Sequence, residues 1–154
     1  MLNRAAHIKP IEILLVEDNP AEIVLAREAL KISKLSIILN VVMDGEEALL
    51  YVRKLGKYTD AKTPDLILLD LNLPKKDGLS VLVEIKADTI LKRIPVIILS
   101  TSSSEVDILN TYTNNANSYI IKPSDFRQLV DIVRSIENFW FTIAKLPTRL
   151  LRHY

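Results

Sequence analysis

Four short apolar runs constrain the fold of this chain most strongly, because each one ends at a polar residue. Their composition is typical of strands buried on both faces of a parallel sheet, and segments with helical spacing separate them. Strands that alternate with helices favour right-handed crossovers, so we predict a doubly wound α/β fold. The runs are residues 13–16, 66–69, 96–99 and 119–121, and the polar residues that follow them are Glu17 and Asp18, Asp70, Ser100 and Lys122.

Capping residues place helices between these strands. Asn19 is expected to cap the first helix, with Pro20 at its first position. Asp44 is expected to cap the second helix, and Gly56 to end it. A long last helix should occupy about residues 125–144. The five strands are expected at about 11–16 and 36–43, in the run before Asp70, from Pro95 onward, and before Lys122.

The composition fits one globular domain and excludes several classes of function. Of 154 residues, 49% are hydrophobic and 25% charged, which argues against a disordered chain. The net charge of +1 gives no reason to expect nucleic acid or an anionic membrane as partner, and the absence of cysteine excludes thiolate chemistry. No signal-peptide core or membrane-spanning stretch is visible, so a cytoplasmic protein is expected. We expect a domain over residues 11–146 between tails at 1–10 and 147–154.

The polar strand ends predict a single chemical site. In an open α/β sheet, ligands bind at the carboxyl ends of the strands, where Glu17, Asp18 and Asp70 would meet Ser100 and Lys122. Carboxylates gathered there resist joint ionisation unless they share a cation, and Mg²⁺ prefers oxygen ligands of this kind. An aspartate can accept a phosphoryl group when a metal, a lysine and a hydroxyl neutralise the transferred charge.

Four motifs in these positions resemble the receiver domain of two-component response regulators. They are VEDN at 16–19, LLDLNLPKKDG at 68–78, VIILST at 96–101 and YIIKP at 119–123, and the resemblance covers residues 11–144. It implies a flavodoxin-like (βα)5 fold with strand order 2-1-3-4-5. It also implies a phosphoacceptor signalling protein rather than an enzyme, one that assists its own phosphorylation and dephosphorylation.

The resemblance assigns a role to each site residue. Asp70 is the phosphoacceptor, and it holds Mg²⁺ together with Glu17, Asp18 and the backbone carbonyl of Asn72. Ser100 contacts the phosphoryl group, where threonine is commoner in the family, and it is preferred to the adjacent Thr101. Lys122 pairs with the phosphoryl group, Pro123 follows a cis peptide bond, and Tyr119 changes rotamer on activation.

The end of the last helix carries a second signal. Its apolar arc is wider than one sheet-facing stripe, which suggests a further contact. We expect Phe139, Trp140 and Phe141 to form a homodimer interface, the alternative being that the arc covers its own domain. On the helical spacing, Phe141 lies off the main apolar face. This segment and the LNLPKKDG motif are similar to the small response regulators of cyanobacterial phytochromes.

The expected function is therefore to accept a phosphoryl group from a sensor histidine kinase, for which a phytochrome is the candidate. No output domain follows the receiver pattern, so output is expected either through binding of another protein or through action of the chain as a phosphate shuttle. A haloacid-dehalogenase-like phosphatase is one alternative, although it carries a second aspartate where this chain has Asn72. A pseudo-receiver that only binds partners is another, and the intact acidic set argues against it.

Overall fold

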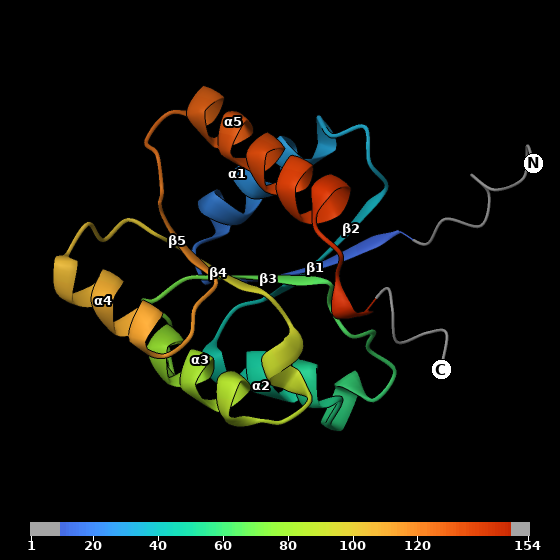
Figure 1. The fold of residues 1–154 in the computed structure, drawn as a ribbon, viewed down its shortest axis with the longest axis vertical. Helices are drawn as coiled ribbons and strands as arrows, with labels where there is room; N and C mark the ends of the chain where they lie inside the picture. The colour runs from blue at the N-terminus through green and yellow to red at the C-terminus, as the bar shows by residue number, and fades with distance from the viewer. Residues whose placement is uncertain (1–9, 149–154) are drawn as a thin grey trace, which may run out of the picture.

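The computed structural model describes residues 10–148, in which five strands and five α-helices alternate along the chain (Figure 1). Two short 3₁₀ helices and one π-helix complete the described part. The strands are β1 (Ile11–Val16), β2 (Ile37–Val42), β3 (Leu66–Leu69), β4 (Val96–Ser100) and β5 (Ser118–Ile121). The α-helices are α1 (Pro20–Lys31), α2 (Gly45–Arg53), α3 (Gly78–Ala87), α4 (Glu105–Thr113) and α5 (Phe126–Ile136). The 3₁₀ helices are Gly56–Tyr58 and Leu91–Arg93, and the π-helix is Glu137–Ile143.

All five strands are parallel and lie in the order β2-β1-β3-β4-β5, which confirms the predicted topology. Helices α1 and α5 cover one face of the sheet, and α2, α3 and α4 lie on the other (Figure 1). Because successive side chains of a strand point to opposite faces, each central strand supplies both cores. In β1, Leu14 and Val16 pack towards α2 and α3, whereas Ile13 and Leu15 pack towards α1 and α5.

The helix starts follow the predicted capping, but one helix end does not. The Asn19 side chain accepts hydrogen bonds from two backbone N–H groups of α1, and Asp44 accepts one from Glu47. The prediction that Gly56 ends α2 is wrong. The helix ends at Arg53, and Lys54 caps it with a left-handed φ of 57° and an N–H that bonds to the Leu50 and Tyr51 carbonyls. Those carbonyls are therefore satisfied two residues before the glycine is reached.

The last helix reaches residue 143 but changes its geometry on the way. After α5 the chain continues as a π-helix, and the Ala144 N–H donates to the Phe139 carbonyl over 2.7 Å. This wider turn rotates the residues that follow it. Within this segment, Phe141 packs against the α1/α5 core together with Trp140, which corrects its expected position off the main apolar face. Phe139 stays 51% exposed.

The predicted tails lie almost entirely outside the described residues. Leu146 is buried, and the Thr148 hydroxyl donates a hydrogen bond to the Asp65 carboxylate, so the packed chain continues to Thr148. No helix within residues 10–148 has the length and apolar character needed to cross a bilayer.

Candidate functional site

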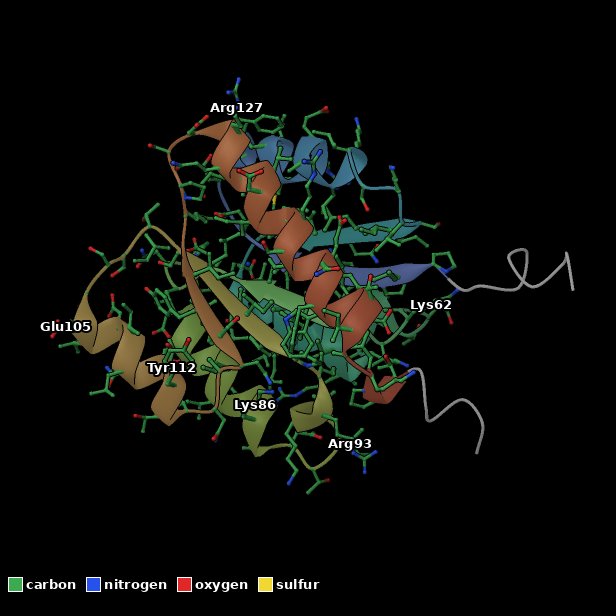
Figure 2. All side chains as sticks on the ribbon, turned by 45° about the horizontal axis from the view of Figure 1, so that its top comes forward. Lys62, Lys86, Arg93, Glu105, Tyr112 and Arg127 are labelled. Atoms are coloured by element: carbon green, nitrogen blue, oxygen red, sulfur yellow. The ribbon has the colours of Figure 1, made fainter. Side chains whose placement is uncertain are left out.

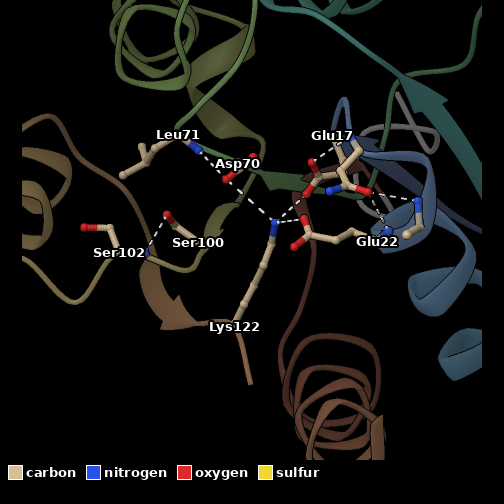
Figure 3. Close-up of polar contacts among 9 residues, drawn as sticks. Glu17, Glu22, Asp70, Leu71, Ser100, Ser102 and Lys122 are labelled. Carbon is tan, nitrogen blue, oxygen red and sulfur yellow. Dashed lines mark hydrogen bonds and ion pairs between the residues drawn. The ribbon is translucent and has the colours of Figure 1, made fainter. Parts of the chain in front are cut away.

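Four of the predicted polar residues meet at the carboxyl edge of the sheet in Figure 3, namely Glu17, Asp70, Ser100 and Lys122. Val16 and Leu69 are register partners in β1 and β3, and the Asp70 N–H continues this ladder by donating to the Val16 carbonyl over 3.1 Å. On the other side, the Lys122 N–H donates to the Ser100 carbonyl over 2.7 Å. The parallel register therefore brings together side chains that are more than 100 residues apart in the sequence.

Glu17, Asp18 and Asp70 form the predicted acidic cluster. Each residue offers a carboxylate oxygen, and these oxygens lie within 4.8 Å of one another. Glu17 and Asp70 are buried, at 2% and 8% exposure, whereas Asp18 is exposed. Hard oxygen ligands from a few carboxylates, with positions left for water and phosphoryl oxygens, fit Mg²⁺. Asn72 follows in an exposed loop, and the metal contact of its carbonyl stays a prediction.

Burial makes the carboxylates of Glu17 and Asp70 hold protons more tightly than usual. Burial raises the pKa of Glu17 to about 7, although the hydrogen bond from Lys122 opposes this shift. The pKa of Asp70 is raised as well, chiefly by burial, against the charge of Lys122 and a hydrogen bond from the Leu71 N–H. A bound divalent cation would favour the ionised carboxylates and remove this penalty.

Lys122 is the cation of the site in the described chain. Its ammonium group donates to Glu17 and, over 2.5 Å, to Glu22, and it lies 3.8 Å from Asp70 (Figure 3). Burial disfavours the charged lysine, but the bonds to Glu17 and Glu22 and the charge of Asp70 outweigh burial and raise its pKa. Glu22 was not predicted from the sequence.

The expected cis bond before Pro123 is absent, since no cis peptide occurs in residues 10–148. For a bond to proline the trans form is the lower-energy default. The backbone hydrogen bond to Ser100 already directs Lys122 at the carboxylates without it.

Hydrogen bonds connect Ser100, the predicted hydroxyl of the site, with Tyr119, the predicted aromatic residue. Ser100 is fully buried and Thr101 is exposed, as expected for adjacent strand residues, so Ser100 faces the site. The Ser100 hydroxyl accepts from the Ser102 N–H over 3.2 Å, and the Tyr119 hydroxyl donates to the Ser102 carbonyl over 2.8 Å. The Tyr119 N–H in turn donates to the hydroxyl of Tyr112, which projects from α4 (Figure 2). Ser102 thus joins the site to Tyr119.

Two glycines shape the loop that carries Asp70. A Cβ on Gly78 would lie 2.1 Å from the Asp70 carbonyl oxygen, and a Cβ on Gly45 would lie 1.9 Å from that of Lys76. Both contacts are with backbone, which cannot move aside cheaply. Only glycine fits at these positions, and no local sequence signal reveals a contact made through the fold.

Comparison with known proteins identifies the family. The family model described as "Response regulator receiver domain" matches residues 13–134, most of the chain. The chain belongs to the response regulator receiver family. Its curated relatives include the response regulator Rcp1 of Synechocystis sp., to which it is 44% identical over 138 residues, 90% of this chain and 94% of Rcp1.

Solved structures give the same result for the receiver fold. The phosphorylated cyanobacterial phytochrome response regulator RcpA superposes with a TM-score of 0.86 at 52% identity, covering 90% of this chain and 99% of RcpA. The Mn²⁺-bound form of Rcp1 superposes with a TM-score of 0.84 at 44% identity, covering 90% and 99% of the two chains. The predicted resemblance and the flavodoxin-like receiver fold are confirmed.

The candidate interface residues lie apart from the acidic cluster. Phe139 and Trp140 line a cavity of about 520 Å³ between β5 and the last helix, with their rings 5.2 Å apart in an edge-to-face arrangement. Trp140 and Phe141 are partly buried against the α1/α5 core. Phe139 is thus the most exposed of the three aromatics and the one best placed for an external contact.

Proposed function

We propose that this receiver accepts a phosphoryl group onto Asp70 from the phosphohistidine of a sensor histidine kinase. The observation that carries the proposal is the convergence of Asp70, two further carboxylates, Lys122 and Ser100 at one sheet edge. Such groups supply the charge neutralisation that phosphoryl transfer needs. Mg²⁺, held by Glu17, Asp18, Asp70 and the Asn72 carbonyl, would neutralise charge on the transferred group.

In the transfer, an Asp70 carboxylate oxygen forms a bond to phosphorus while the bond between phosphorus and the histidine nitrogen of the kinase breaks. The imidazole leaves with the bonding electron pair and takes up a proton. Lys122 starts 3.8 Å from Asp70 and is the nearby ammonium that can pair with the new phosphoryl oxygens. Ser100 offers a hydroxyl donor from the fully buried end of β4.

Phosphorylation would reach the surface through Ser102 and Tyr119. A phosphoryl group adds up to two negative charges and attracts nearby donors. If the Ser100 hydroxyl turns towards it, the hydrogen bond from Ser102 is lost, and the Ser102 carbonyl that holds Tyr119 can shift. Tyr119 is therefore the proposed reporter of the phosphorylated state, and a protein that binds nearby would read it.

A phytochrome is the proposed kinase. The support is similarity, since RcpA is described as a cyanobacterial phytochrome response regulator and is 52% identical to this chain. We place both partners in the cytoplasm, where a kinase draws its phosphoryl group from ATP. No basic cluster motivates a nucleic-acid partner, and the net charge is +1.

We also propose a homodimer that uses the exposed side of the last helix. Phe139 and Ile143 are 51% and 62% exposed, and aromatic anchors are favoured in interface cores. Trp140 and Phe141 would support this surface from beneath, since both pack inward. A two-fold arrangement is the simplest closed solution for one self-complementary patch.

Phosphotransfer from purified histidine kinases tests the proposal. A set that includes a cyanobacterial phytochrome kinase is autophosphorylated and mixed with the receiver. Label should move to the receiver in Mg²⁺ and stay on the kinase in EDTA. Steady turnover of a phosphate ester without a kinase would favour the phosphatase alternative, and failure to bind Mg²⁺ would favour the pseudo-receiver.

A further inference from the structure

Glu22 is a carboxylate at the site that the receiver motifs do not include. It projects from the first turn of α1, and its Oε2 atom lies 2.5 Å from the Lys122 ammonium nitrogen (Figure 3). The Glu22 side chain is 32% exposed and that of Lys122 is 11% exposed. Glu22 therefore reaches the lysine from the solvent side, opposite the buried carboxylate of Asp70.

The turn before α1 sets this position. The Glu17 carboxylate accepts from the Asn19 N–H over 3.1 Å, and the Asn19 side chain accepts from the Glu22 N–H over 3.3 Å. Pro20 occupies the start of the helix. The backbone from Glu17 to Glu22 is thus pinned by its own hydrogen bonds, and Glu22 is held facing Lys122.

The distances place Lys122 nearer to Glu22 than to Asp70. The ammonium group is 2.5 Å from Glu22 and 3.8 Å from Asp70, so at rest it bonds to Glu22 and not to Asp70. A phosphoryl group on Asp70 brings anionic oxygens within reach of the ammonium group, and these oxygens compete with Glu22 for it. Glu17 can turn to the metal when Lys122 leaves, whereas Lys122 is the one cation that pairs with Glu22 in the described chain.

We infer that Glu22 is a positioning residue that holds Lys122 in the resting state and competes with the phosphoryl group for it. The inference rests on the proposed acceptor role of Asp70. Loss of the Glu22 charge frees Lys122, so phosphoryl-like anions bind more tightly and the phosphorylated form lasts longer. The competition between Glu22 and the phosphoryl group for Lys122 therefore sets how strongly the protein responds to phosphorylation.

Beryllofluoride, a non-reacting mimic of the phosphoryl group, tests this without a kinase. Its affinity is measured with saturating Mg²⁺ by ¹⁹F NMR titration of wild type, Glu22→Gln and Glu28→Gln. Glu22→Gln should bind about two- to fivefold more tightly, the range for a partly exposed ion pair. Glu28→Gln is the matched control, since Glu28 lies on the same helix, is exposed and pairs with Lys31. Its affinity should equal that of wild type.

The Lys122→Met background separates positioning from a general charge effect. There, Glu22→Gln should leave the affinity unchanged, because the shared lysine is gone. If Glu22→Gln raised the beryllofluoride affinity equally in both backgrounds, or did not raise it in the wild-type background, the role of Glu22 would be overturned. A wild type that binds no beryllofluoride in Mg²⁺ would overturn the acceptor site itself, a result distinct from equal binding by wild type and Glu22→Gln.

Proton exchange of the Lys122 ammonium group gives a second readout. Because Glu17 and Glu22 both hold the ammonium group, its protons should exchange slowly enough for ¹⁵N NMR detection, and Glu22→Gln should speed the exchange. Glu28→Gln should not. Unchanged exchange in Glu22→Gln would contradict the contact on which the competition depends.

Discussion

The ammonium group of Lys122 lies 3.8 Å from the Asp70 carboxylate, held there by its contacts with two glutamates. Its backbone is fixed as well, since the Lys122 N–H donates to the Ser100 carbonyl at the end of β4. The lysine is thus positioned beside the acceptor before any phosphoryl group arrives. It balances the charge of the site at rest and is available to respond when that charge changes.

Lys122→Ala should separate phosphorylation from its consequence. The variant keeps the carboxylates and still takes label, but it loses the response of its partner. Without Mg²⁺ it should also be less stable by about 3 kcal/mol, because buried Glu17 is left without its cation. Urea unfolding with and without Mg²⁺, together with partner binding, checks both effects. A variant that switched its partner normally would show that the coupling runs through other residues.

Asp18→Ala should weaken Mg²⁺ binding by about tenfold or more, as expected for loss of about 1.4 kcal/mol of ligand contact. Asp18 is the exposed member of the acidic cluster, so its removal leaves the core packing intact. Calorimetric titration measures the affinity, with exposed Asp60→Ala as the control for surface charge. Equal affinities in wild type and Asp18→Ala would remove Asp18 from the metal site.

Glu137 should make stability depend on pH. It is 8% exposed, one carboxylate oxygen has no hydrogen-bond partner, and the other accepts from the Ser33 hydroxyl over 2.8 Å. Burial raises its pKa above the ordinary 4.5, against the hydrogen bond from Ser33 and the charge of Arg134. The folded state therefore binds this proton more tightly than the unfolded chain. Its stabilising contribution is complete below pH 4.5 and is lost as the pH rises through the folded-state pKa.

Comparison with Glu137→Gln isolates this effect from other titrations. The variant removes the buried charge, so its free energy of unfolding should exceed that of wild type by about 1 kcal/mol at pH 8. The difference should shrink towards pH 5. Urea unfolding at both pH values measures it, and a constant difference would exclude Glu137 as the titrating group.

Phe139→Asp should yield a monomer without loss of the fold. Phe139 is 51% exposed, so the new charge can remain in water, whereas Phe141→Asp would place a charge against the core and should destabilise the protein. Sedimentation at about 50 µM, where a modest interface is occupied, compares wild type with Phe139→Asp. A wild type that is monomeric whether or not it is phosphorylated would contradict the homodimer.

The sequence predicted best those features that depend on residues close together in the chain, namely the polar residues at strand ends and the helix caps. Asp70 and Lys122 follow apolar strands and Ser100 ends one, so the order of the strands was enough to bring them together. Asn19 and Asp44 were predictable as caps because capping is decided within one helical turn.

The remaining features depend on geometry that single residues do not encode. In the sequence, Glu22 looks like any acidic residue in the first turn of a helix. Its role was missed because only the fold brings Lys122, 100 residues away, into contact with it. Phe141 packs against the core within a π-helix, whose repeat the apolar spacing of the sequence does not reveal. The end of α2 at Arg53 was missed because Lys54, a non-glycine residue, adopts the left-handed conformation after it.

The role of Asp70 as the phosphoacceptor is tested most directly with acetyl phosphate, which needs no protein partner. Wild type and Asp70→Asn are treated in Mg²⁺ and weighed intact by mass spectrometry. Wild type should gain the mass of one phosphoryl group, lose it after brief treatment with base, and fail to gain it in EDTA. Asp70→Asn should gain none. Undiminished base-labile labelling of Asp70→Asn would contradict the assignment of Asp70 as the acceptor.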